Sequence, residues 1–114
     1  MKGQLTDKIR MQHILDAIAE TEKYLINSNF EDFVSNSEKR FATIKQIEII
    51  GEACNHLTNE LKQQHTEIEW LQINGFRNIS VHEYFGIDFN IVWDIAKNDL
   101  PVLKQKFTQI LKEL

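Results

Sequence analysis

The sequence predicts an all-α protein, an antiparallel bundle of four to five helices. The 114 residues include one proline and four glycines, and runs in which β-branched residues alternate with polar ones are scarce. Apolar residues recur instead at intervals of three and four, the spacing of one face of a helix. A hydrophobic content of 42% at this length suits one core, so residues 1–114 are expected to form a single domain.

Two helical segments are expected before residue 35. The first begins at Thr6, whose side chain can cap a helix, and ends at the polar run 27–29. A short piece from Phe30 to Val34 follows. The face of the first helix that should be buried carries Ile14, Ile18, Thr21 and Leu25.

A long third helix is expected from Ser35 or Ser37 to about Gln63. Its continuous apolar face is formed by Phe41, Ile44, Ile47, Ile50, Cys54, Leu57 and Leu61. Gly51 lies inside this helix, where glycine costs about 1 kcal/mol relative to alanine. A glycine at this position indicates that another part of the backbone approaches the helix closely.

Shorter helical pieces are expected after the third helix. Residues 66–69 have the spacing of a capping box, which predicts a short helix that ends at Asn74 and Gly75. A further helical piece is expected from Phe76 to about Tyr84.

The last helix is expected to begin after Asp88, which can cap it, and to run to the end of the chain. Pro101 should kink or split it near Asp99, because proline lacks an N–H and clashes with the preceding turn. Its apolar face is formed by Val92, Ile95, Ala96, Leu100, Leu103, Phe107, Ile110 and Leu114.

Composition narrows the class of function. A formal net charge of -4 argues against a simple polybasic protein that binds nucleic acid or anionic membranes. The lone Cys54 is expected to be buried as a small hydrophobic residue and excludes an internal disulfide. The first ten residues resemble no signal peptide, and no apolar run is long enough for a membrane helix, so we expect a cytoplasmic protein without a membrane partner.

The densest group of reactive side chains lies in residues 77–84. Arg77 supplies a planar guanidinium suited to a phosphate, and His82 is the residue type that titrates nearest neutral pH. Asn78 lies one turn before His82 if the segment is helical. An imidazole that transfers protons beside a guanidinium that neutralises a phosphorane can cleave RNA without a metal or other cofactor.

Structural alternatives exist for each of these side chains. Arg77 could pair with a nearby acid such as Glu83, while His82 merely packs or caps. Two of the other three histidines, His13 and His65, are expected to be solvated. A metal is a further alternative, because a carboxylate–imidazole–carboxylate ladder recurs at intervals of four on the expected third helix, at Glu52, His56 and Glu60. A closed site would need ligands from a second helix, so no metal is expected.

Two stretches resemble the HepT-like branch of the HEPN superfamily. Residues 75–88 read Gly-Phe-Arg-Asn-Ile-Ser-Val-His-Glu-Tyr-Phe-Gly-Ile-Asp. Residues 49–53, Ile-Ile-Gly-Glu-Ala, resemble the Ile-Gly-Glu-Ala signature of the same family. The resemblance covers essentially the whole chain and implies a HEPN-like helical bundle that forms a homodimer.

The resemblance also implies a function. It implies the toxin of a toxin–antitoxin pair, a metal-independent endoribonuclease that acts on transfer RNA and is neutralised by a minimal nucleotidyltransferase antitoxin, which transfers AMP to Tyr84. Arg77 would bind the scissile phosphate and His82 would act as general acid or base. Asn78 would orient the phosphate or the histidine, and Glu52 would line the cleft or tether Arg77. Two alternatives are a non-catalytic nucleotide- or substrate-binding companion of a nucleotidyltransferase and a helical adaptor.

Overall fold

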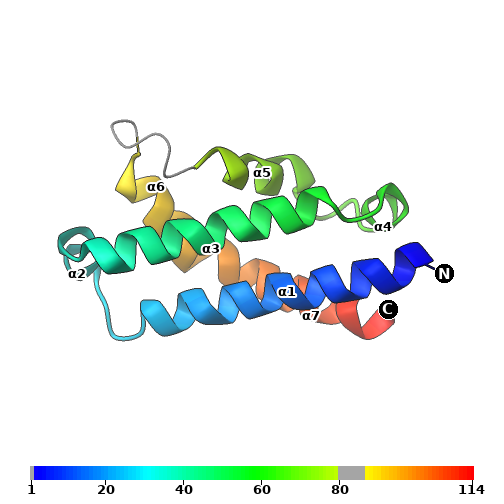
Figure 1. The fold of residues 1–114 in the computed structure, drawn as a ribbon, viewed down its shortest axis with the longest axis horizontal. Coiled ribbons are helices and arrows are strands. Elements are labelled where there is room, and N and C mark those ends of the chain that lie inside the picture. The colour runs from blue at the N-terminus through cyan, green and yellow to red at the C-terminus, as the bar shows by residue number, and fades with distance from the viewer. Residues whose placement is uncertain (1, 80–86) are drawn as a thin grey trace.

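The computed structural model describes residues 2–79 and 87–114, and in these residues the only regular secondary structure is helical (Figure 1). The fold class expected from the sequence, an all-α bundle, is therefore confirmed. The helices are α1 (Lys2–Tyr24), α2 (Phe30–Ser35), α3 (Ser37–Asn55), α4 (Asn59–Gln64), α5 (Trp70–Asn74), the 3-10 helix η1 (Gly75–Asn78), α6 (Phe89–Asp94), the π-helical turn η2 (Ile95–Asp99) and α7 (Leu100–Glu113).

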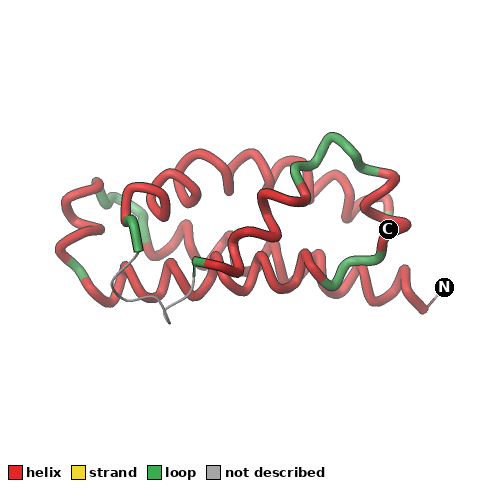
Figure 2. The backbone as a smooth tube through the Cα atoms, turned by 90° about the horizontal axis from the view of Figure 1, so that it is seen from above, coloured by secondary structure: helices red, strands yellow, loops and turns green. Residues whose placement is uncertain are grey.

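The long helices lie side by side in an elongated bundle of 46 × 27 × 21 Å. α1 and α3 are antiparallel neighbours, α7 packs along α1, and α5 with η1 covers the opposite side of α3 (Figure 1). Seen from above, α1 and α7 bring the two ends of the chain to one end of the bundle (Figure 2). η1 lies directly against α3.

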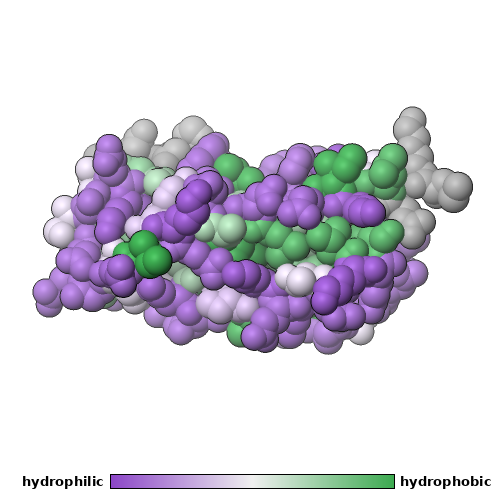
Figure 3. Space-filling view, turned by 90° about the horizontal axis from the view of Figure 1, so that it is seen from below, coloured by the Kyte–Doolittle hydropathy of each residue, from purple (hydrophilic) through white to green (hydrophobic). Residues whose placement is uncertain are grey.

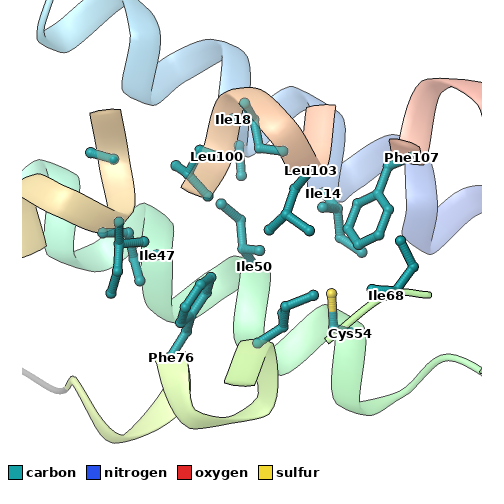
Figure 4. Packing of buried hydrophobic residues seen from close by; sticks show 14 of the residues in the cluster. Ile14, Ile18, Ile47, Ile50, Cys54, Ile68, Phe76, Leu100, Leu103 and Phe107 are labelled. Atoms are coloured by element: carbon teal, nitrogen blue, oxygen red, sulfur yellow. The ribbon is translucent and has the colours of Figure 1, made fainter. Parts of the chain in front are cut away.

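The apolar faces expected from the sequence form the core (Figure 4). Isoleucines of α1 and α3 meet Leu100, Leu103 and Phe107 of α7 there. Cys54 points inward among them, and burial raises the pKa of its thiol to about 12. It is therefore an apolar core residue rather than a nucleophile, as expected.

The N-terminal half differs from the expectation at the start of its first helix and at the end of its third, whereas the third helix begins at Ser37 as expected. α1 begins at Lys2, so Thr6 lies within the helix rather than at its cap. α3 ends at Asn55, and Thr58 caps the separate helix α4 by accepting a hydrogen bond from the backbone N–H of Leu61 at 3.3 Å. The single helix expected to reach about Gln63 is therefore wrong.

The break between α3 and α4 is held by a buried carboxylate. Asp7 of α1, which is 3% exposed, accepts hydrogen bonds from the backbone N–H and the hydroxyl of Thr58 at 2.9 and 2.6 Å. These two bonds satisfy the donors of Thr58 outside a helical ladder. A contact between residues 51 positions apart thus ends the helix, and no local pattern indicates it.

The capping box expected at residues 66–69 is also wrong. α5 begins after Glu69, whose side chain makes no capping bond. The indole N–H of Trp70 instead donates to the carbonyl of His65 at 2.9 Å, and His65 is half-buried rather than solvated. Phe41, which was expected on the buried face of the third helix, is exposed.

The last helical segment begins and is interrupted where the sequence predicts. Asp88 accepts a hydrogen bond from the backbone N–H of Asn90 at 2.9 Å and so caps α6. The chain then widens into the π-helical turn η2, in which the N–H of Leu100 donates to the carbonyl of Ile95. α7 starts there with Pro101 in its first turn, where the missing N–H needs no partner. The split expected at Asp99 is confirmed.

Not all apolar surface is covered. Viewed from below, the face over α1 and α7 carries a band of apolar side chains between hydrophilic ones (Figure 3). Leu5 and Ile9 of α1 and Val102 of α7 are among the exposed large hydrophobic residues. Within residues 2–79 and 87–114, no helix has both the length and the apolar character needed to cross a bilayer.

Replacement of Asp7 by alanine is expected to lower the free energy of unfolding by about 1–3 kcal/mol, because two donors of Thr58 lose a buried acceptor. Urea denaturation followed by circular dichroism measures the change. Asp16→Ala is the matched control on the same helix, since Asp16 is exposed and accepts a hydrogen bond from exposed Gln12, one turn away; its effect should stay within about 0.5 kcal/mol. Equal effects of the two substitutions would contradict the role of Asp7.

Candidate functional site

The candidate site is built on the contact between α3 and η1. A Cβ atom added to Gly51 would lie 2.9 Å from the backbone nitrogen of Arg77 and 3.0 Å from the Cβ atom of Phe76. Real Cβ atoms essentially never approach other heavy atoms so closely. The close approach expected from a glycine inside a helix is therefore confirmed, and η1 is the element that makes it.

Phe76 fixes the orientation of η1. Its ring is 3% exposed and points into the core beside Ile50 of α3 (Figure 4). Arg77 is the next residue of the same tight turn, and its side chain is 39% exposed. Burial of one side chain thus places its neighbour at the surface, next to the outer face of α3.

On that face Arg77 meets a carboxylate. Its Nε atom lies 2.9 Å from Oε2 of Glu52, and its Nη1 atom donates to Oδ1 of Asn74 at 3.2 Å. The other oxygen of Glu52, Oε1, lies 2.9 Å from Nε2 of His56, one turn further along α3. We call Arg77, Glu52 and His56 the Arg–Glu–His cluster.

The cluster is accessible to ligands. The side chains of Glu52 and His56 are 53% and 50% exposed, so solvent screens the ion pairs and they add little to stability. The ion pairs instead determine the orientation of the Arg77 guanidinium and the local charge. Glu52 and Asn74 restrain two edges of the guanidinium, while three of the five N–H donors that an arginine carries are not used by these contacts.

The structure places some of the predicted site residues, whereas others lie outside the residues it describes. The expected contact between Glu52 and Arg77 is present. Asn78 ends η1 and is exposed. His82 and Tyr84 lie outside the described residues, as does Glu83, the acid considered as a partner of Arg77. Their roles stay predictions.

The metal ladder is not supported by the geometry. Glu52 and His56 are adjacent, but α3 ends before His56, and Glu60 belongs to α4. In the part of the chain that the structure describes, no three potential ligands among His, Cys, Asp and Glu come together. Residues spaced by four share a face only while the helix continues, and the break after Asn55 separates Glu60 from Glu52 and His56.

The sequence does not predict that His56 and Arg77 share Glu52. The interval of four between Glu52 and His56 predicts a metal ladder instead. The signal for the cluster is nevertheless present, because Glu52 is both the expected partner of Arg77 and one turn from an imidazole.

Fold and cluster together define the class of protein: a small helical bundle that presents, at its surface, an arginine restrained by a carboxylate. Comparison with known families makes this specific, because the family described as "Ribonuclease HepT-like" matches residues 14–110. The chain belongs to this HepT-like family of the HEPN superfamily, as the sequence resemblance implied.

Named relatives agree with this membership. The chain is 37% identical over 102 residues to a Thermococcus cleftensis protein named "Probable ribonuclease HepT", with 90% of this chain and 93% of the relative covered. It is 32% identical over 108 residues to a "Putative RNase" of Caldanaerobacter subterraneus subsp. tengcongensis, with 95% and 96% covered.

A third relative is longer. The chain is 36% identical over 107 residues to a Methanocaldococcus jannaschii protein named "Gamma-glutamylcyclotransferase and putative RNase". The match covers 94% of this chain but only 48% of that protein, so the chain spans about half of its length. No solved structure matches the chain.

Gly51→Ala is expected to lower the free energy of unfolding by about 1–3 kcal/mol, because the added methyl group meets the backbone of η1 rather than a flexible side chain. It should also displace Arg77. Gly75→Ala is the matched control, since nothing lies within 4 Å of the added atom and its φ of -63° suits alanine. Thermal unfolding of both variants checks the difference, and a Gly51→Ala protein as stable as Gly75→Ala would contradict the close approach.

Proposed function

We propose that the protein is a metal-independent endoribonuclease, the toxin of a cytoplasmic toxin–antitoxin pair, and that residues 1–114 act as a single HEPN-like domain. The observation that supports this most directly is the exposed guanidinium of Arg77, restrained by Glu52 and Asn74 at the surface of the bundle. Membership of a ribonuclease family supports the same reaction.

The proposed chemistry is transesterification. The 2′-hydroxyl of the ribose loses its proton and its oxygen bonds to phosphorus, while the bond from phosphorus to the 5′-oxygen breaks and that oxygen takes up a proton. Arg77 binds the phosphate and offsets the charge of the phosphorane with the donors that Glu52 and Asn74 leave available. His82 acts as general acid or base, and Asn78 orients the phosphate or the imidazole.

The proposed substrate is transfer RNA and the proposed form is a homodimer. Exposed apolar side chains, including Ile49 beside the cluster on α3 and Leu5 and Ile9 on α1, supply surface of the kind that dimers bury. The proposed partner is a minimal nucleotidyltransferase antitoxin that transfers AMP to Tyr84. An added nucleotide close to the phosphate site would repel RNA by its negative charge.

Purified protein is expected to cleave total transfer RNA in EDTA and to leave 2′,3′-cyclic phosphate ends. Arg77→Ala and His82→Ala should each slow cleavage at least about 100-fold, because one removes the charge at the phosphate and the other removes proton transfer. Gel analysis with mapping of product ends gives the measurement. His13→Ala and Lys104→Ala, both at exposed positions, are the matched controls and should cleave like the wild type.

Two results would contradict the proposed nuclease. Loss of cleavage in EDTA would show that the reaction needs a metal ion. No cleavage by wild-type protein shown by mass spectrometry to be unmodified would favour the non-catalytic companion of a nucleotidyltransferase. Circular dichroism must show that the variants fold like the wild type.

Tyr84→Phe is expected to retain cleavage but to abolish the acceptance of AMP from labelled ATP in the presence of the nucleotidyltransferase, since the phenolic oxygen is the proposed acceptor. Tyr24→Phe is the matched control and should accept AMP like the wild type. It removes a phenolic oxygen that accepts a hydrogen bond from Gln46, between α1 and α3, and that is not the proposed acceptor. Labelling of the Tyr84→Phe protein at the wild-type level would refute Tyr84 as the acceptor.

A further inference from the structure

The Arg–Glu–His cluster contains an imidazole that the proposed reaction does not use. Glu52 is shared: Oε2 lies 2.9 Å from Nε of Arg77, and Oε1 lies 2.9 Å from Nε2 of His56. All three side chains are between 39% and 53% exposed, so an incoming polyanion can approach them. The charge of His56 therefore affects how strongly Glu52 neutralises Arg77.

The charge of Glu52 opposes the binding of RNA. With a neutral imidazole, the carboxylate cancels the charge of Arg77, and a phosphate that contacts the guanidinium also approaches Glu52. With a protonated imidazole, Glu52 gains a second cationic partner and the cluster carries one net positive charge. Histidine is the residue type that can carry either charge state within the pH range used to study proteins.

Other charged groups at this end of α3 do not reverse the argument. By element, they are Asp7 on α1, and Glu60 and Lys62 on α4. Together with Glu52 and Arg77 of the cluster, three carboxylates stand against two cations. A neutral imidazole therefore leaves the group with an excess of negative charge, and its protonation removes that excess.

We propose that His56 is a further member of the RNA-binding site: protonated, it occupies Glu52 and leaves the charge of Arg77 available to an RNA phosphate. The inference rests on the proposed function, because it assigns the phosphate of RNA to Arg77. His56 acts through Glu52 and is a positioning residue rather than a catalytic one. It makes the affinity for RNA increase as the pH falls.

The test measures binding separately from cleavage. All proteins carry His82→Ala, which removes the proposed proton transfer and the titration of that imidazole. Binding of labelled total transfer RNA is measured by fluorescence anisotropy in EDTA at constant salt, from about pH 8 to about pH 6, on either side of the ordinary histidine pKa. Constant salt is essential because phosphate contacts depend strongly on it.

Three variants separate charge from structure. With His56 intact, RNA should bind about two- to tenfold more tightly at the lower pH, the range expected for one charge acting across a solvent-exposed carboxylate. His56→Gln should lose most of this dependence and bind weakly throughout. His56→Lys should bind tightly across the whole range, because a lysine four residues after Glu52 keeps a cation on that carboxylate.

Controls test whether the effect is local. His13→Gln removes another exposed imidazole, on α1, and should leave the pH dependence unchanged. In an Arg77→Ala background, His56→Gln should have little further effect, because the proposed coupling passes through Arg77. Circular dichroism verifies that each variant folds.

Failure of this inference is distinguishable from failure of the proposed function. Tight binding of RNA with the same pH dependence in the parent and in His56→Gln would overturn the role of His56 and leave the nuclease proposal intact. The same conclusion follows if His56→Lys binds no better than His56→Gln. Absence of RNA binding by the parent at every pH would overturn both.

Discussion

The close contact of η1 with α3 at Gly51 is the constraint on which the candidate site depends. Arg77 reaches Glu52 because its own backbone nitrogen lies where a side chain of residue 51 would otherwise stand. The same contact inserts Phe76 into the core. Burial of an aromatic ring, which is favourable by a few kcal/mol, thus fixes the position of a charged side chain that could not fix itself.

The end of α3 is the second determinant of the site. Asp7 binds the backbone and hydroxyl of Thr58, and α3 ends at Asn55 with His56 as its C-cap. Glu52 then lies between an arginine from one segment and an imidazole from its own helix. A structural hydrogen bond from α1 therefore decides which charged groups surround the carboxylate.

Some features were predictable because their cause is local. The apolar faces of the long helices, the cap at Asp88 and the split at Pro101 depend on residues within a few positions of one another. Gly51 was informative for the same reason, since a glycine in a helix is unfavourable unless space requires it. The third helix was not predictable in length, because the contact that ends it joins Asp7 to Thr58, 51 positions away. At residues 66–69 the spacing of a capping box is present, but the bond of the Trp70 indole to the His65 carbonyl forms instead.

The sequence by itself determined an all-α bundle, its family and the residue types available for phosphate chemistry. The tertiary structure decided which of them meet. Arg77 and Glu52 are 25 positions apart, and His56 joins them only because α3 continues one turn beyond Glu52 and stops there. Periodicity records which face of a helix is buried, whereas pairing between exposed side chains depends on how helices pack. That packing is set by the shapes of buried residues such as Gly51 and Phe76.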